Sequence, residues 1–198
     1  MTHIIGLTGG IATGKSTVSS MFEEQGIPVL CADRMAHALM KKGTSVSKKI
    51  MDEFGAVILD KDGEIDRALL GPLVFADEEK RNKLNAIVHP EVRRILLERL
   101  KQFLEQKIPL VVLDIPLLFE SNLGHLCQST LLVYAPREIQ IERIRARDHL
   151  PDDEIERRLA AQIDIEDKKS KADFIIYNDR DLGETKEQFL DLLSKLKS

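Results

Sequence analysis

The feature that most constrains this chain is a glycine-rich stretch close to its N-terminus, residues 9–16 (GGIATGKS). The stretch satisfies the G-x-x-x-x-G-K-[ST] pattern of a phosphate-binding loop, or P-loop, in full. The apolar residues 3–7 before it predict a buried strand, and residues 15–24 after it predict a helix that ends at Gly26. A loop of this kind between a strand and a helix predicts an α/β fold in which the loop binds an anion.

The residue types of the loop explain how it would hold phosphate. Glycines let backbone N–H groups close around phosphate oxygens, because no Cβ atom stands in the way, and the following helix directs its positive end at the same anion. We expect Lys15 to reach the β- and γ-phosphates of ATP and the Ser16 hydroxyl to bind Mg²⁺. The predicted nucleotide-binding residues of the loop are Gly9, Gly10, Ile11, Ala12, Thr13, Gly14, Lys15, Ser16 and Thr17.

The rest of the chain alternates between strand-like and helix-like patterns, which predicts a mainly parallel sheet. Further strands are predicted at residues 28–30, 107–113, 130–134 and 174–177, and further helices at 136–147, 152–162 and 183–196. Residues 34–106 offer several helical segments and no convincing strand, with turn signals at Gly43, Gly55, Asp62-Gly63 and His89-Pro90. This excursion is placed where a nucleotide-type kinase binds its acceptor, although helices that only complete the core would give the same pattern.

Composition narrows the possible partners of the chain. Its 198 residues carry a net charge of −4, so no overall charge attracts it to nucleic acid or to an anionic membrane. Its two cysteines, Cys31 and Cys127, lie far apart and fit neither a disulfide framework nor a metal site. The N-terminus lacks the features of a signal peptide, and no apolar run reaches the ~18 residues of a membrane span. We therefore expect a soluble, cytoplasmic protein whose cysteines are not nucleophiles.

The P-loop occurs in several classes of protein, and the remaining motifs favour a small kinase. A GTPase would carry N-K-x-D, but the nearest string, residues 82–85 (NKLN), lacks the carboxylate that reads guanine. The dinucleotide pattern G-x-G-x-x-G is absent. A chain barely longer than one P-loop domain fits a kinase that acts on a metabolite. Two alternatives remain, namely a P-loop kinase for another nucleotide or sugar and a non-catalytic switch that binds ATP.

Arginines concentrate in one late segment. Residues 137–158 hold six of the chain's thirteen arginines and no lysine, a bias that suits bidentate phosphate binding. Arg143 and Arg147 stand four residues apart on the predicted helix without an acidic residue three or four positions away, whereas Arg145 has Glu142 and Asp148 in range. We expect Arg143 and Arg147 to bind nucleotide phosphate and Arg145 to pair on the surface, the alternative being that all three lie on a solvated helix face.

A series of motifs over residues 3 to about 180 resembles the dephospho-CoA kinase family and follows the family's order. The motifs are residues 6–11 (GLTGGI), 32–33 (AD), 65–67 (IDR), 70–71 (LG), 84–90 (LNAIVHP), 114–120 (DIPLLFE), 143–148 (RIRARD) and 161–162 (AQ). The resemblance implies a single kinase domain that phosphorylates the ribose 3′-hydroxyl of dephospho-CoA with ATP. It also implies a five-stranded parallel core at about 1–33 and 107–198, a helical acceptor-side subdomain at about 34–106 and an arginine-rich lid at about 143–162.

The resemblance also assigns roles to particular residues. Lys15, Asp33 and Arg143 are expected to be catalytic, with Asp33 orienting the acceptor hydroxyl and accepting its proton; its alternative role is to cap the helix after the second strand. The expected acceptor-binding residues are Asp33, Arg67, His89 and Asp114, and the expected Mg²⁺ ligands are Ser16 and Asp114. A turn or capping role for Asp114, a structural His89 and a surface Arg67 are the simpler alternatives.

Two positions depart from the family's pattern. Cys31 stands where the family often has the first aspartate of Asp-Ala-Asp, so any role of that carboxylate is absent here or supplied by another group. Residues 176–179 (IYND) replace the usual Asn-Asn-Gly-like ending, which puts in doubt an adenine contact at Asn178.

Overall fold

The computed structural model describes residues 2–121 and 123–197. The chain divides into two compact units. We call residues 1–30 with 106–198 the sheet unit and residues 31–105 the helical unit. No helix in the described ranges is both long enough and apolar enough to cross a bilayer.

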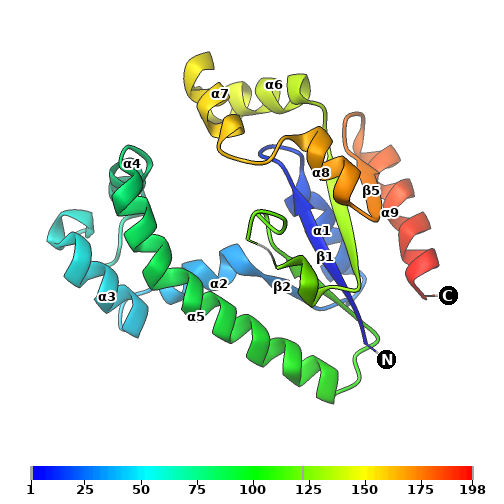
Figure 1. The fold of residues 1–198 in the computed structure, drawn as a ribbon, viewed down its shortest axis with the longest axis horizontal. Coiled ribbons are helices and arrows are strands. Elements are labelled where there is room, and N and C mark those ends of the chain that lie inside the picture. The colour runs from blue at the N-terminus through cyan, green and yellow to red at the C-terminus, as the bar shows by residue number, and fades with distance from the viewer. Residues whose placement is uncertain (1, 122, 198) are drawn as a thin grey trace. The chain divides into compact units, whose positions relative to one another are not determined.

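A five-stranded sheet with the order β2-β3-β1-β4-β5 forms the centre of the sheet unit (Figure 1). β1 pairs in parallel with β3 on one side and with β4 on the other, and β4 pairs in parallel with β5. The chain therefore changes direction across the sheet at β1, and the loop that follows β1 lies at this switch point, where open α/β sheets bind ligands. The strands are β1 (His3–Gly9), β2 (Val29–Cys31), β3 (Leu110–Asp114), β4 (Ser129–Tyr134) and β5 (Phe174–Tyr177).

The five predicted strands are all present, as is the parallel sheet. β3 begins at Leu110, three residues later than predicted, because Lys107 has a left-handed backbone (φ 53°) that an extended strand does not accommodate. Otherwise the strand ends fall within two residues of the predicted ones. The strands of a doubly covered parallel sheet are buried on both faces, and every residue of β3 and β4 is buried.

In its described residues, the sheet unit has the α-helices α1 (Lys15–Glu24), α6 (Arg137–Asp148), α7 (Asp152–Ala160), α8 (Ile165–Lys171) and α9 (Leu182–Lys197). The sequence predicted four of them and missed α8. Its seven residues (IEDKKSK) contain one apolar side chain, so no hydrophobic period marks the helix. The helix is instead defined by its cap, because the Asp164 carboxylate accepts a hydrogen bond from the Glu166 N–H at 2.9 Å.

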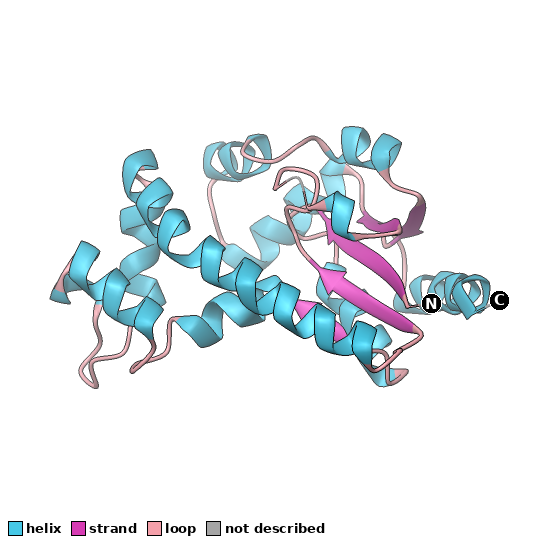
Figure 2. Ribbon diagram, turned by 60° about the horizontal axis from the view of Figure 1, so that its bottom comes forward, coloured by secondary structure: helices cyan, strands magenta, loops and turns pink. Residues whose placement is uncertain are grey.

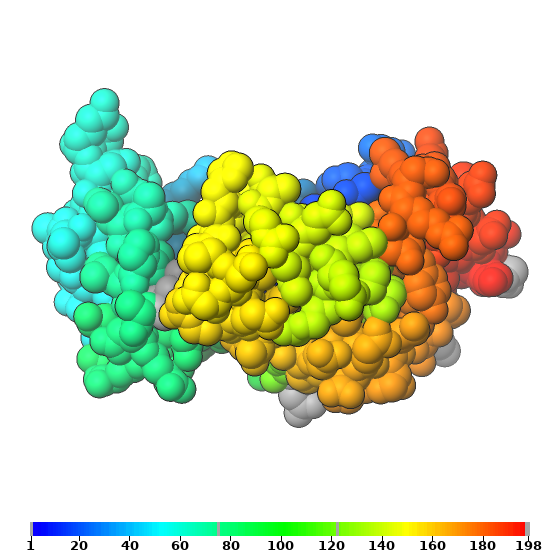
Figure 3. Space-filling view, turned by 90° about the horizontal axis from the view of Figure 1, so that it is seen from above, coloured from blue at the N-terminus to red at the C-terminus, as the bar shows by residue number. Residues whose placement is uncertain are grey.

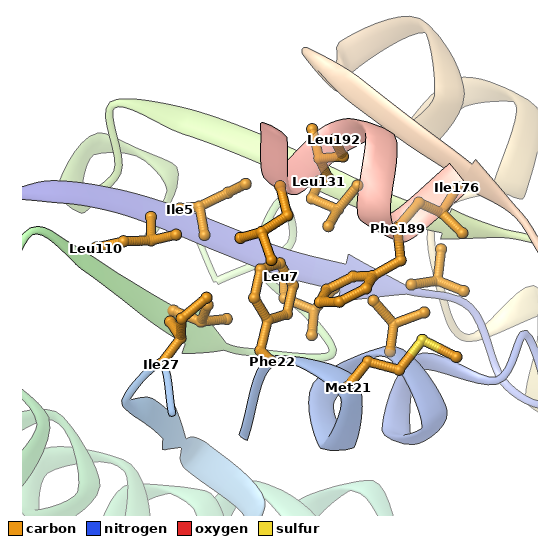
Figure 4. Close-up of a cluster of buried hydrophobic side chains, with 14 residues drawn as sticks. Ile5, Leu7, Met21, Phe22, Ile27, Leu110, Leu131, Ile176, Phe189 and Leu192 are labelled. Atoms are coloured by element: carbon orange, nitrogen blue, oxygen red, sulfur yellow. The ribbon is translucent and has the colours of Figure 1, made fainter. Parts of the chain in front are cut away.

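The core of the sheet unit lies between the sheet and helices α1 and α9 (Figure 4). Ile5 and Leu7 of β1 and Leu131 of β4 are fully buried there. Phe22 of α1 meets Phe189 of α9 edge to face, with ring centroids 4.8 Å apart and ring planes at 85°. This pair joins the helix that follows the glycine-rich loop to the last helix of the chain.

The helical unit has a core of its own and consists of helices and loops (Figure 2). Its elements are α2 (Ala32–Leu39), α3 (Ser45–Phe54), a 3₁₀ turn (Ala56–Ile58), α4 (Arg67–Phe75) and α5 (Glu78–Glu105). Its buried side chains are Val46, Ile50, Ile58, Leu70, Val74 and Val88. The expectation of no strand in this region is confirmed for its described residues, where the bridge between Leu59 and Ile65 stays isolated.

Two local predictions in the helical unit are wrong. The His89-Pro90 pair does not form a turn, because it lies inside α5, a continuous helix of 28 residues. Proline removes one backbone donor, but α5 packs against α2, α3 and α4, and this packing outweighs the local cost.

Asp33 is not the cap of α2, because the helix already begins at Ala32 and Cys31 occupies the capping position. Asp33 lies in the first turn, where a negative charge faces the positive end of the helix.

We expect Phe189→Ala to lower the free energy of unfolding of the sheet unit by about 3–5 kcal/mol, the usual cost of removing a buried phenyl ring. Phe189 is 2% exposed, whereas its neighbour Leu190 is 45% exposed and supplies a matched control. Leu190→Ala should cost less than about 1 kcal/mol. Urea denaturation of both variants measures the difference, and similar costs would contradict the packing described for α9.

Candidate phosphate-binding site

The loop between β1 and α1 holds a conformation that depends on its glycines. Ala12 (φ 59°) and Gly14 (φ 86°) both have left-handed backbones. The Thr13 N–H and hydroxyl donate to the Gly10 carbonyl at 3.4 and 3.0 Å, which closes the turn. A Cβ atom on Gly14 would lie 2.0 Å from Nδ2 of Asn178, so this position requires glycine for its conformation and for its space.

Three side chains hold carbonyl groups of the loop from outside. Nζ of Lys168 donates to the Gly9 carbonyl at 3.3 Å, and a guanidinium nitrogen of Arg143 donates to the Ala12 carbonyl at 3.2 Å. Nδ2 of Asn178 donates to the Thr13 carbonyl at 2.8 Å. Carbonyl oxygens repel anions, and in a trans peptide the C=O and N–H groups point in opposite directions. For the Gly9–Gly10 and Thr13–Gly14 peptides, holding the carbonyl outward therefore favours an N–H that faces a bound phosphate, whereas the Thr13 N–H is used within the turn.

Lys15, the invariant lysine of the P-loop pattern, is paired with a carboxylate from the end of β3. Its ammonium donates to Oδ1 of Asp114, and the Ser19 hydroxyl donates to Oδ2 of the same side chain at 2.9 Å. Asp114 is 2% exposed, so without these donors its charge would be buried alone. A phosphate that enters the loop would compete with Asp114 for the Lys15 ammonium.

The residues near the loop fit a magnesium ion better than a metal bound entirely by protein. Ser16 lies exposed in the first turn of α1, and the Asp114 carboxylate lies beside Lys15. Within residues 2–121 and 123–197, no three His, Cys, Asp or Glu side chains form a group that would hold a metal. Magnesium commonly uses one or two protein oxygens and completes its shell with water and substrate phosphates. Ser16 and Asp114 match this chemistry.

The three arginines of α6 differ from the predicted arrangement. Arg147 was expected to lack an acidic partner, and this is wrong, because its guanidinium donates to both carboxylate oxygens of Asp148 at 2.7 and 2.9 Å. This pairing raises the pKa of Arg147 and lowers the pKa of Asp148, in each case mainly through the hydrogen bond. Arg145 pairs with Asp152 at the start of α7 rather than with Glu142 or Asp148. Adjacent residues can meet at the end of a helix, which spacing rules for helix interiors do not capture.

Arg143 lies against the loop itself. Besides its bond to the Ala12 carbonyl, it donates to the Asn178 carbonyl at 2.8 Å and so bridges the loop and the segment after β5. The segment that carries it packs on the loop as well, because the cluster of Ile144, Ile155 and Leu159 includes Ile11 and Ala12. α6 and α7 lie at the surface of the face that Figure 3 shows, in yellow-green and yellow.

The structure identifies several further residues at the site that sequence reasoning missed or left open. Both polar atoms of the Asn178 side chain are engaged, since Nδ2 reaches Thr13 and Oδ1 accepts from the Thr185 hydroxyl at 2.9 Å. Asn178 therefore supports the loop and is not free to read a base. Its position directly after the predicted last strand was a signal in the sequence that Asn178 lies near the site. Lys168 had none, because it stands among other charged residues of α8.

The other predicted site residues belong to the helical unit. Asp33 is exposed in the first turn of α2. Arg67 is the exposed first residue of α4, next to the capping Asp66, and His89 is exposed on α5 directly before Pro90. The structure thus brings Lys15, Asp114 and Arg143 to the loop and places Asp33, Arg67 and His89 in the second unit.

Gly14 and Gly26 allow a controlled test of the loop. Both have left-handed backbones, but a Cβ on Gly26 would meet nothing within 4 Å. We expect Gly26→Ala to cost about 1 kcal/mol of stability and to leave nucleotide binding unchanged. Gly14→Ala should also displace Asn178 from Thr13 and weaken MgATP binding by about tenfold or more. Thermal melting and calorimetric titration measure both effects, and equal MgATP affinities would rule out the proposed need for glycine at position 14.

Comparison with known proteins agrees with the geometry of this site. The family described as dephospho-CoA kinase matches residues 3–184. A dephospho-CoA kinase from Oceanobacillus iheyensis is 45% identical over 195 residues and covers 98% of each chain. Another from Bacillus licheniformis is 46% identical over 193 residues, with 98% of this chain and 96% of the relative covered.

Solved structures agree with these matches. The protein TT1252 from Thermus thermophilus has a TM-score of 0.78 at 38% identity and covers 98% of both chains. Dephospho-CoA kinase from Campylobacter jejuni has a TM-score of 0.73 at 32% identity, over 99% of this chain and 98% of that one. Shikimate kinase from Bacteroides thetaiotaomicron, at 17% identity and a TM-score of 0.51, shares the fold. The chain belongs to the dephospho-CoA kinase family.

Proposed function

We propose that this protein transfers the γ-phosphate of ATP to the ribose 3′-hydroxyl of dephospho-CoA, which gives coenzyme A and ADP in the final step of coenzyme A biosynthesis. The observation that carries the proposal is the pairing of Lys15 with Asp114 beside a loop whose carbonyls are held outward. The loop is thus arranged for polyphosphate, and family membership supplies the acceptor.

The residues of the loop would stabilise the phosphates mainly by position and charge. Backbone N–H groups of residues 9–16 would surround the phosphate oxygens, and Lys15 would leave Asp114 to neutralise the β- and γ-phosphates. Ser16 and Asp114 would hold Mg²⁺, which supplies further neutralisation of the phosphates when it is bound. Because Asp114 also accepts from Ser19, its carboxylate stays oriented after Lys15 moves.

Arg143 would direct its remaining N–H donors at the transferring phosphate from its place beside the loop. A guanidinium carries five N–H donors, and two carbonyl contacts leave further donors for an anion. Arg147 would bind nucleotide only after its contact with Asp148 is shared or exchanged. We therefore assign the larger contribution to Arg143.

The acceptor side of the reaction is assigned to the helical unit. Asp33 would orient the 3′-hydroxyl and accept its proton, while Arg67 and His89 would contact dephospho-CoA. The exposure of all three side chains and their agreement with the family's motifs support these assignments. In a loose phosphoryl-transfer transition state the proton leaves late, so a weakly basic carboxylate that is well positioned is sufficient to accept it.

Radiolabelled ATP offered with a panel of acceptors tests the proposed function directly. We expect the label to appear in dephospho-CoA, with little transfer to shikimate, gluconate or nucleoside monophosphates. Lys15→Ala should reduce this transfer by about a hundredfold or more, because one preorganised cation is lost from the phosphates. Transfer to a different acceptor would show that dephospho-CoA is not the substrate. ATP binding without any transfer would indicate a non-catalytic switch protein.

Asp33→Asn separates catalysis from structure. The amide keeps the shape of the side chain but accepts no proton, so we expect kcat to fall by about 10²–10⁴-fold. Because Asp33 is not the cap of α2, the variant should lose at most about 1 kcal/mol of stability, from its interaction with the helix end. Steady-state kinetics and thermal melting check both outcomes. Full activity per folded molecule would exclude Asp33 as the proton acceptor.

A further inference from the structure

An ion pair between a buried lysine and a partly exposed glutamate lies next to the end of β1 and has no part in the mechanism described so far. Lys168 of α8 is 0% exposed, and its ammonium lies 2.7 Å from Oε1 of Glu120 and 3.3 Å from the Gly9 carbonyl. α8 lies close to β4, whose neighbour in the sheet is β1 (Figure 1). The ammonium thus contacts the residue at which β1 ends and the loop begins.

The contact between Lys168 and Gly9 fixes one particular peptide. The bond between Gly9 and Gly10 is trans, so a carbonyl directed at Lys168 sends the Gly10 N–H in the opposite direction. Gly10 itself is confined, since a Cβ there would lie 2.9 Å from Oε1 of Gln140 and 3.3 Å from Cδ1 of Ile165. The hydrogen bond from Lys168 and the close approach of Gln140 and Ile165 therefore restrict the first peptide of the phosphate loop.

Glu120 connects this contact to a third segment. Its Oε1 also accepts from the Ile163 N–H at 3.2 Å, in the connection between α7 and α8. Its Oε2 is buried without a hydrogen-bond partner among the described residues. A fully buried ammonium and a carboxylate oxygen buried without a partner add little stability, because apolar side chains of the same volume serve as well or better. The arrangement is better explained by what the ammonium does at Gly9.

We propose that Lys168 is a positioning residue for phosphoryl transfer and that Glu120 is the counter-ion that orients it. Lys168 aligns the Gly9–Gly10 peptide so that its N–H faces the nucleotide, and it adds a fixed positive charge behind the loop. Because Glu120 also holds Ile163, the same pair ties the end of the α6–α7 segment to the loop. The inference rests on the proposed function for its reaction, but its effect on ATP binding is independent of the acceptor.

The test removes both charges together. Lys168→Met alone would leave Glu120 buried without a counter-ion, so the main variant is Lys168→Met with Glu120→Gln, which keeps both shapes and an acceptor for Ile163. Lys171→Met is the matched control, since Lys171 lies exposed on the same helix. Lys168→Arg keeps the charge and serves as the rescue variant. Calorimetric titration with MgATP, thermal melting and steady-state kinetics are measured for each protein.

We expect the double variant to fold, to bind MgATP about tenfold more weakly and to lose kcat by about ten- to a hundredfold. Its KM for dephospho-CoA should stay within about twofold of the wild-type value, because the acceptor does not use this peptide. Lys168→Arg should recover part of the loss, and Lys171→Met should match wild type. If the double variant does not fold, Glu120→Gln alone should show a smaller rise in the Kd for MgATP.

The proposal is overturned if a folded double variant, or Glu120→Gln in its place, keeps the wild-type Kd for MgATP and kcat. An equal rise in KM for both substrates would also overturn it, since that result indicates general loosening of the site. A wild-type protein that transfers no phosphate to dephospho-CoA would refute the proposed function instead, and the MgATP titrations would still decide the role of Lys168.

Discussion

The structure depends on one constraint, namely that residues 9–16 must keep their backbone N–H groups available for an anion before the anion arrives. A flexible glycine-rich loop would not hold this arrangement alone, because each glycine gains conformational freedom when it is released. The protein therefore fixes the loop through its carbonyls, with Lys168 at Gly9, Arg143 at Ala12 and Asn178 at Thr13. These side chains come from three late segments of the chain, so the loop acquires its shape only when the sheet unit is assembled.

We propose different uses for two ion pairs that lie next to this loop. Lys15 and Asp114 form a pair that nucleotide can open, because phosphate offers the lysine a stronger anion and Ser19 continues to hold the carboxylate. The pair of Lys168 and Glu120 would stay closed, since the lysine is fully buried and donates to the Gly9 carbonyl. A pair of this kind adds little to stability, so its presence next to Gly9 indicates a demand for orientation.

Much of the fold could be predicted because its elements carry local signals. The boundaries of α1 match the prediction, since the loop glycine and Gly26 mark its ends, and the buried strands show as continuous apolar runs. Two of the misses, at Pro90 and at α8, share one cause, which is tertiary contact. Packing carries α5 through Pro90, and α8 forms from a charged stretch because Ile165 and Lys168 are both buried in the completed fold. A periodic pattern of apolar residues cannot indicate that a lysine is buried.

The arginines of α6 show that prediction of the site from sequence has the same limit, because it does not include tertiary contacts. Helix spacing predicted that Arg143 differs from Arg145, and the structure confirms a difference. The reason was incomplete, however, because spacing considers only side-chain partners on the same helix. Arg143 instead donates to backbone carbonyls. Those carbonyls belong to the loop and to the segment after β5, two places that sequence alone does not bring together. Since both are neutral, the guanidinium keeps its full charge beside the loop. We therefore propose that Arg143 contributes directly to the anion site, whereas Arg147 would first have to give up Asp148.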